Sequence, residues 1–282
     1  MGVNLSQDEL ERLVRASIEE DLGRRDLTSE AVVPQEVRAR GTFVSKQELV
    51  LAGSDVAQTA FRLMDGQVDW VNMVTDGALT SVGQLLAVVR GRARPMLAAE
   101  RVALNFMQRM TAVATLTRRF VDAVAGTGVQ VRDTRKTTPL LRALEKYAVE
   151  LGGGVPHRSG LDSGVLVKEN HVRLAGSVGA ATRRACAAAD GHLVEVEVEY
   201  LDQIEEALAA GAGMILLDNF SPEDAHKAVR LVAGRVPLEV SGGVRLDNVR
   251  AYAEAGPNFI AVGALTHSAP GADISLEIEP EG

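Results

Sequence analysis

Cationic side chains gather in one stretch of an otherwise acidic chain, between Asp133 and His171. They include Arg135, Lys136, His157, Arg158, Lys168 and His171, in a chain of 282 residues with a net charge of −8. Arginine can grip a carboxylate through two parallel hydrogen bonds, whereas lysine is a point charge suited to phosphate oxygens. The stretch therefore predicts a local polyanion site. The alternatives are surface ion pairs of the arginines with Glu145, Glu150 or Asp162, and a core histidine at His157.

Three carboxylates, Glu195, Glu197 and Glu199, alternate with valines in a predicted strand. The period of two in a strand places them on one face, about 7 Å apart. They would repel one another unless cations, metal or hydroxyls met them. We interpret Glu197 as a ligand of sugar hydroxyls or magnesium, with Lys136 and Lys168 as counter-charges. The alternative is an edge strand with a solvated acidic face.

Two glycine loops follow the last two predicted strands. They are Ser241, Gly242 and Gly243 in the first, and Val262, Gly263, Ala264, Leu265, Thr266 and His267 in the second. Glycine lets backbone N–H groups approach an anion, and helix N-termini favour negative charge. The pair of loops predicts a phosphate site, and ordinary turns are the alternative.

Six short apolar runs, most of them separated by helical segments, predict parallel βα units after Gly128. The runs are 129–131, 165–167, 194–198, 215–217, 238–240 and 259–262. We expect an open or incomplete α/β barrel of about six strands, with a doubly wound sheet as the alternative. In a barrel the strand ends carry the site, which adds Asp218 to the candidates.

The part before this region has a different rhythm. Short β-like runs at 40–44, 48–52, 68–71 and 85–89 predict a small α/β domain with an antiparallel sheet, and helical periodicity from Leu97 to Val124 marks the junction. We expect an N-terminal α/β sandwich domain over residues 1–110, to which residues 270–282 return, and a barrel domain over 111–269.

Composition narrows the class of protein. The acidic balance and the low aromatic share argue against nucleic-acid binding, and no apolar run is long enough to span a membrane. The polar start has no signal-peptide pattern, and Cys186 is the only cysteine, so we expect a cytoplasmic protein.

These segments together resemble the nicotinate-nucleotide pyrophosphorylase (carboxylating) family, also called quinolinate phosphoribosyltransferases. The resemblance rests on residues 100–105, 133–139, 145–148, 152–154, 157–158, 168–171, 195–197, 217–219, 241–243 and 262–268. It implies transfer of phosphoribosyl from phosphoribosyl pyrophosphate to the ring nitrogen of quinolinate. The 2-carboxylate is then lost, giving nicotinate mononucleotide, pyrophosphate and CO2.

The resemblance also implies roles for individual residues. The dicarboxylate pocket would be lined by Arg135, His157, Arg158 and Lys168, with Arg101 reaching it from a neighbouring subunit, and Thr134 would be a further substrate-binding residue. Lys136 would join Lys168 near the pyrophosphate, Glu197 and Asp218 would hold the ribose, and the glycine loops would take the 5′-phosphate. Lys136, Lys168, Glu197 and Asp218 are the expected catalytic residues. Magnesium is expected mainly through phosphoribosyl pyrophosphate, without direct protein ligands, in a homodimer or higher homo-oligomer.

Several positions depart from the family pattern, most of them in the acid-binding half: Leu140 in place of a glycine, Pro156 in place of an asparagine, Asp162 one place early and Ala112 in place of a glycine. They leave three rivals open. One is a related transferase for another acid or base, or a paralogue associated with molybdate transport. The second is a Schiff-base lyase barrel using Lys168 or Lys136. The third is a binding protein without turnover.

Overall fold

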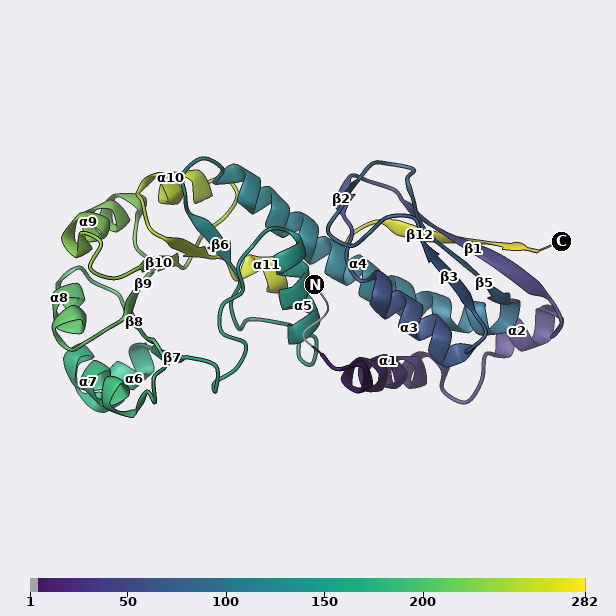
Figure 1. Cartoon of the computed structure of the whole chain (residues 1–282), viewed down its shortest axis with the longest axis horizontal. Helices are drawn as coiled ribbons and strands as arrows, with labels where there is room; N and C mark the ends of the chain where they lie inside the picture. Colours follow the sequence, from purple (N-terminus) through teal and green to yellow (C-terminus); the bar gives the residue numbers. More distant parts are fainter. Residues whose placement is uncertain (1–4, 282) are drawn as a thin grey trace. The chain divides into compact units, whose positions relative to one another are not determined.

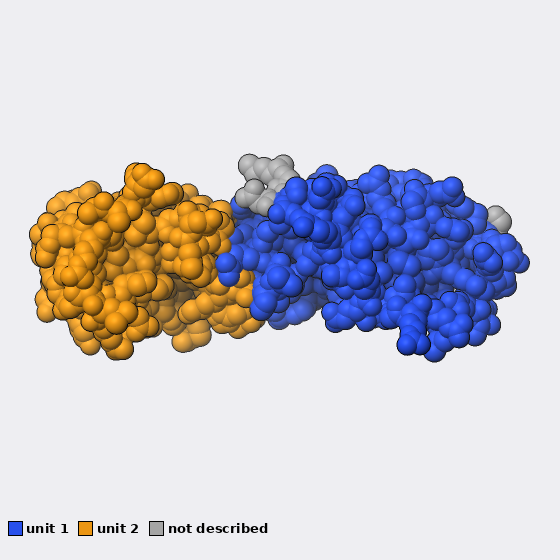
Figure 2. Space-filling view, turned by 90° about the horizontal axis from the view of Figure 1, so that it is seen from below, with its two compact units in different colours: residues 1–118, 138–153, 269–282 blue, residues 119–137, 154–268 orange. Residues whose placement is uncertain are grey.

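The computed structural model describes residues 5–281 (Figure 1). Residues 1–4, which hold most of the polar start, and residue 282 lie outside the described residues. The chain forms two compact units, coloured separately in Figure 2. Unit 1 takes its residues from within 1–118, 138–153 and 269–282, and unit 2 comprises 119–137 and 154–268.

Unit 1 contains a four-stranded antiparallel sheet in the order β12-β1-β5-β3, and a separate pair of strands, β2 and β4. Its elements are α1 (Gln7–Leu22), α2 (Leu27–Val32), β1 (Arg38–Ser45), β2 (Leu49–Val50), α3 (Ser54–Met64), β3 (Asp69–Asn72), β4 (Leu79–Thr80), β5 (Leu85–Arg92), α5 (Arg142–Leu151) and β12 (Ile274–Pro280). The predicted antiparallel sheet is confirmed. The run 48–52, however, contributes only the two residues of β2.

Side chains from the four-stranded sheet and from α3 form an aromatic cluster in unit 1. The ring of Phe43 on β1 lies 6.0 Å from Phe61 on α3 and 5.3 Å from Trp70 on β3, measured between centroids. Every second residue of β1 is buried, which is the alternation of a strand with one face against a core. Helix α1 begins with a capping box between Ser6 and Glu9.

Helix α4 (Ala93–Ala123) begins in unit 1 and ends in unit 2, so the long helical period predicted at the junction is observed. The remaining elements of unit 2 are β6 (Gln130–Arg132), β7 (Val165–Val167), α6 (Glu169–Ala175), α7 (Val178–Ala188), β8 (Val194–Val198), α8 (Asp202–Ala209), β9 (Met214–Asp218), α9 (Pro222–Val232), β10 (Leu238–Ser241), α10 (Val249–Glu254), β11 (Phe259–Ala261) and α11 (Ala264–His267). Figure 1 shows α7, α8 and α9 on the outer side of these strands.

The six strands of unit 2 form one parallel sheet in the order β6-β11-β10-β9-β8-β7. The first strand, β6, therefore pairs with the last, β11, and the other neighbours follow the order of the chain. A doubly wound sheet reverses its strand order at a switch point instead. The arrangement is that of an α/β barrel left open between β6 and β7, which confirms the predicted fold class.

Within residues 5–281, no helix is long and apolar enough to cross a membrane.

Candidate active site at the strand ends of unit 2

Charged side chains converge at the carboxyl ends of β7, β8 and β9. Nζ of Lys168, which follows β7, donates to Oε2 of Glu197 at 2.7 Å. Burial, and then the charge of Glu197, raise the pKa of Asp218, whereas Lys168 and Lys136 lower it. Two carboxylates and two lysines thus share one electrostatic environment, in which Lys168 is a counter-charge of Glu197.

The two glutamates of β8, Glu195 and Glu197, and Glu199 just after the strand differ in exposure. Glu195 is buried, Glu197 is partly exposed and Glu199 is exposed. Strand β8 pairs with β7 on one side and β9 on the other. The alternative of an edge strand with a solvated face is therefore wrong. The carboxylates run from the interior of the barrel to its open end.

The loop that carries Lys136 lies against α11 and Gly263, the residue before it. Oγ1 of Thr266 donates to the carbonyl oxygen of Lys136 at 2.7 Å, and the Lys136 N–H donates to Oγ1 of Thr134 at 3.0 Å. A Cβ added to Gly263 would lie 3.2 Å from Nε2 of His267 and 3.3 Å from Cδ of Lys136. Glycine at 263 thus lets the lysine pack beside this loop.

A second contact joins the loops after β9 and β10. The N–H of Asn219 donates to the carbonyl oxygen of Ser241 at 2.8 Å, and its side-chain amide donates to Oδ2 of Asp218 at 2.8 Å. Gly242 has φ of 91°, and a Cβ there would lie 2.1 Å from Oδ1 of Asn219. Only glycine fits this position. Asn219 was not among the predicted site residues, although its place after Asp218 is a signal for it.

The two arginines of the acid-binding half lie in one environment as well. Burial, and then the charge of Arg135, lower the pKa of Arg158, and Glu195 acts in the opposite direction. Nη1 of Arg158 donates to the carbonyl oxygen of Gly164 at 2.9 Å. Like charges held this close favour an anionic ligand.

His157 connects these arginines to the barrel interior. Its N–H donates to Oδ1 of the buried Asp133 at 2.8 Å, and its Nδ1 accepts the N–H of Arg158 at 2.7 Å. Its Nε2 lies 3.1 Å from Oε2 of Glu195 and 3.5 Å from Oε1 of Glu239. Glu239 was missed in the sequence, where a carboxylate between Leu238 and Val240 in an apolar strand was the available signal.

Comparisons with known proteins identify this arrangement. The family model described as quinolinate phosphoribosyl transferase, N-terminal domain, matches residues 26–111, and the C-terminal domain model matches residues 113–277. The chain belongs to the quinolinate phosphoribosyltransferase family. A Mycobacterium leprae relative named nicotinate-nucleotide pyrophosphorylase (carboxylating) is 44% identical over 272 residues, covering 94% of this chain and 95% of its own.

Solved structures of the family agree along the whole chain. The nicotinate-nucleotide pyrophosphorylase of Francisella tularensis is 35% identical, with a TM-score of 0.94 and 98% of both chains covered. NadC from Streptococcus pyogenes is 36% identical, also with a TM-score of 0.94, and the match covers 100% of both chains. The resemblance read from the motifs is thus confirmed at the level of the family.

One predicted site residue of the family pattern belongs to a different unit from the others. Arg101 is exposed on α4 and belongs to unit 1, whereas the other predicted site residues all belong to unit 2. Glu145, one of the proposed surface partners of the arginines, is buried and accepts hydrogen bonds from Arg109 and Thr138.

Two departures from the family pattern have a structural reading. Leu140 stands where the family pattern has glycine and keeps a left-handed backbone, with φ of 67°. Ser163, in the shifted Asp162–Ser163 pair, accepts the N–H groups of Ser159 and Gly160 at 3.0 and 2.9 Å. This closes the loop whose Gly164 carbonyl receives Arg158.

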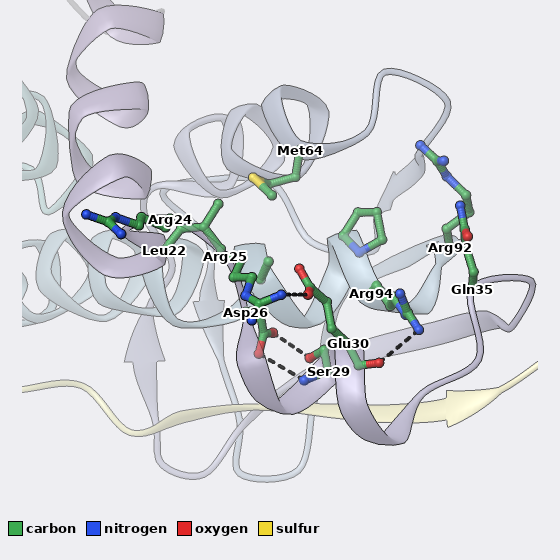
Figure 3. A pocket seen from close by; sticks show the side chains of 12 residues that line it. Leu22, Arg24, Arg25, Asp26, Ser29, Glu30, Gln35, Met64, Arg92 and Arg94 are labelled. Atoms are coloured by element: carbon green, nitrogen blue, oxygen red, sulfur yellow. Dashed lines mark hydrogen bonds and ion pairs between the residues drawn. The ribbon is translucent and has the colours of Figure 1, made fainter.

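A hollow in unit 1 also contains arginines, among them two that already pair with nearby protein groups. Figure 3 shows it, with Leu22, Arg25, Glu30, Met64 and Arg94 among the side chains that line it. Arg25 pairs with Glu30 at 3.4 Å, and Arg94 donates to the carbonyl oxygens of Val33 and Glu30 at 2.7 and 3.1 Å. None of the predicted site residues lines this hollow.

Proposed function

We propose that this chain transfers phosphoribosyl from phosphoribosyl pyrophosphate to quinolinate with decarboxylation, as a step of NAD biosynthesis. Both family domains match, and their names give the activity. The observation that carries the proposal is the Lys168–Glu197 pair beside Asp218 at the strand ends. Both substrates are polyanions, so an acidic protein needs such a local set of cations to bind them.

Glu197 and Asp218 face the ribose of the donor in this proposal. Breaking the glycosidic bond develops positive charge on the ribose ring, which carboxylates held in place beforehand stabilise. The 5′-phosphate binds the loops at Gly242, Gly243 and Gly263, where the backbone can approach an oxygen closely. Lys136 and Lys168 neutralise the departing pyrophosphate.

Arg135 and Arg158 bind the carboxylates of quinolinate. Once the ring nitrogen carries ribose it is cationic, and it accepts the electron pair left when the adjacent C–CO2 bond breaks. A proton then replaces the carboxylate on that carbon. Thr134, His157 and Lys168 complete the pocket, and Arg101 is contributed by a second copy of the chain, so the active enzyme is at least a dimer. Its single cysteine supports a cytoplasmic location.

Magnesium is part of the proposal as a companion of the pyrophosphate. Mg²⁺ prefers oxygen ligands and binds through one or two carboxylates, water and substrate phosphates. Glu197 and Asp218 fit this requirement, because the charge of Glu197 contributes to the raised pKa of Asp218, and a cation would relieve that repulsion. The ion supplies charge neutralisation to the leaving pyrophosphate, and the residues hold it mainly through that group.

Turnover of the purified chain tests the proposal. With phosphoribosyl pyrophosphate and Mg²⁺ it should release CO2 from quinolinate and leave nicotinate unreacted. Consumption of nicotinate in its place would favour a transferase for another acid. A borohydride-trapped adduct on Lys168 would favour a Schiff-base lyase, and donor binding without pyrophosphate release would favour a binding protein.

Arg135→Ala separates the two halves of the pocket. We expect it to abolish measurable quinolinate binding, because a charged hydrogen bond to a carboxylate contributes roughly 1.5–3 kcal/mol and Arg135 provides up to two. Affinity for phosphoribosyl pyrophosphate should stay within about threefold. Calorimetric titration with each substrate measures both, with Arg230→Ala on α9 as a control. Equal loss of both affinities would contradict this division.

A further inference from the structure

A charged layer lies inside the barrel, below the strand ends. Arg132 on β6, Glu239 on β10 and Glu195 on β8 come from alternate strands of the sheet. Alternate strands of α/β barrels usually contribute such layers from bulky apolar residues. Here Glu239 has 0% and Glu195 5% of its surface exposed. Burial of this kind is costly and calls for a reason.

The two carboxylates of this layer are only partly satisfied. Oε2 of Glu239 accepts a hydrogen bond from Nη1 of Arg132 at 2.8 Å. Oε1 of Glu239 and Oε1 of Glu195 are buried and accept no hydrogen bond within residues 5–281. The remaining oxygen, Oε2 of Glu195, lies 3.1 Å from Nε2 of His157. The ring of His157 therefore points into the layer.

The hydrogen bonds of His157 fix its tautomer. Nδ1 accepts the N–H of Arg158 at 2.7 Å, so it holds no hydrogen. In a neutral imidazole the hydrogen must then be on Nε2, which makes Nε2 a donor toward Glu195.

The same tautomer argues against a metal site formed by His157, Glu195 and Glu239. His157, Glu195 and Glu239 have ligand atoms within 4.8 Å of one another, as a metal site would. A metal ion, however, needs a free lone pair on Nε2, and Arg132 already neutralises one of the carboxylates.

We propose that Glu195, backed by the Arg132–Glu239 pair, is a positioning residue that holds His157 as its Nε2–H tautomer. His157 in turn fixes the backbone of Arg158 for the acid substrate. This rests on the proposed function, because Arg158 is taken to bind quinolinate. His157 then lines the pocket but acts on the substrate through Arg158, because both of its ring nitrogens face protein groups.

Two substitutions of Glu195 test the hydrogen bond. Glu195→Leu removes the acceptor, and we expect the KM for quinolinate to rise about tenfold, while the KM for phosphoribosyl pyrophosphate and kcat stay within about twofold. Glu195→Gln keeps an acceptor oxygen, so it should restore the quinolinate KM to within about threefold of wild type. Glu205→Gln, which changes an exposed glutamate paired with Arg235, is the matched control.

The outcomes separate this inference from its rivals. If Glu195→Gln is as impaired as Glu195→Leu, the charge of Glu195 matters and not its acceptor oxygen, and the inference fails. A parallel rise of both KM values would show general disruption and would also overturn it. Absence of quinolinate turnover in the wild-type chain is a different result, which refutes the proposed function.

Nitrogen-15 NMR of the imidazoles gives a readout that does not depend on enzyme activity. The wild-type chain has five histidines, and loss of one signal set in His157→Gln assigns the ring. We expect a neutral ring protonated at Nε2 and unchanged by added Zn²⁺ or chelator. A ring protonated at Nδ1, a charged ring or a metal-dependent shift would overturn the inference.

Discussion

Glu145 in unit 1 and Glu239 in unit 2 both have 0% of their surface exposed, but their surroundings differ. Glu145 accepts two hydrogen bonds from Arg109, at 2.9 and 2.7 Å, and two from Thr138, at 3.0 and 2.7 Å. Glu239 accepts one from Arg132, and its other oxygen accepts none within residues 5–281. Burial, and then Glu195, raise the pKa of Glu239 to about 7.

The difference shows that burial alone does not decide what a carboxylate does. Where hydrogen bonds replace lost water, the charged side chain can fix a loop, as Glu145 fixes the segment between Thr138 and α5. Where a buried carboxylate accepts too few hydrogen bonds, its protonated form is favoured and its pKa rises, as at Glu239. The first glutamate is structural, and the second is a titratable group beside the site.

Glu145→Ala should have the largest effect. It leaves the partly buried Arg109 and the N–H of Thr138 without their acceptor, and breaking such a pair costs roughly 3–5 kcal/mol of unfolding free energy. Urea unfolding measures it. Glu150→Ala, at an exposed position of the same helix, should change the free energy by less than about 0.5 kcal/mol. Similar unfolding free energies for Glu145→Ala and Glu150→Ala would contradict a structural role of Glu145.

The pH dependence of stability tests Glu239. Its pKa is higher in the folded chain than in the unfolded one, so the folded state binds the proton more tightly between pH 4.5 and about 7. Stability from this group is complete below pH 4.5 and is lost as the pH rises through about 7, by roughly 1–3 kcal/mol.

Glu239→Gln should remove this contribution, because an amide does not titrate. Urea unfolding between pH 4.5 and 8 measures the difference between wild type and variant. Glu205→Gln should keep the wild-type slope in that window. Parallel pH profiles of wild type and Glu239→Gln would mean that Glu239 is charged throughout, like a fully hydrogen-bonded carboxylate.

The smallest effect is expected at Leu140, in the segment that Glu145 holds. A left-handed conformation costs a residue with a Cβ roughly 1–2 kcal/mol, and glycine escapes this cost at some loss of unfolded-state entropy. Leu140→Gly should therefore raise the unfolding free energy by about 0.5–1 kcal/mol. Leu140→Ala keeps a Cβ and should not. An equal rise in unfolding free energy for Leu140→Gly and Leu140→Ala would mean that the exposed leucine side chain, and not the backbone conformation, causes the effect.

Local patterns made much of this molecule predictable. Each apolar run after Gly128 contributes to a strand, because parallel strands covered on both faces are rich in aliphatic residues. Side chains that end such strands must meet at one rim of the sheet, which is why Lys168, Glu197 and Asp218 could be grouped from the sequence.

Contacts between distant segments could not be predicted in this way. His157 lies in a loop, whereas Glu195 and Glu239 lie on two separate strands. The contacts of His157 with the two glutamates follow no periodic spacing in the sequence. The same holds for Asn219 against Gly242. In a sequence, a glycine indicates a flexible backbone. At Gly242 the missing side chain also leaves room for the side-chain amide of Asn219.

The pairing of β12 with β1 has a consequence for biosynthesis. Ser45 pairs with Ile274, so the central sheet of unit 1 joins strands more than two hundred residues apart in the chain. During synthesis on the ribosome, the edge of β1 that pairs with β12 stays unpaired until the whole of unit 2 has been made. Open strand edges invite pairing with other chains. The nascent protein thus depends on its last strand to close a sheet that its first strand began.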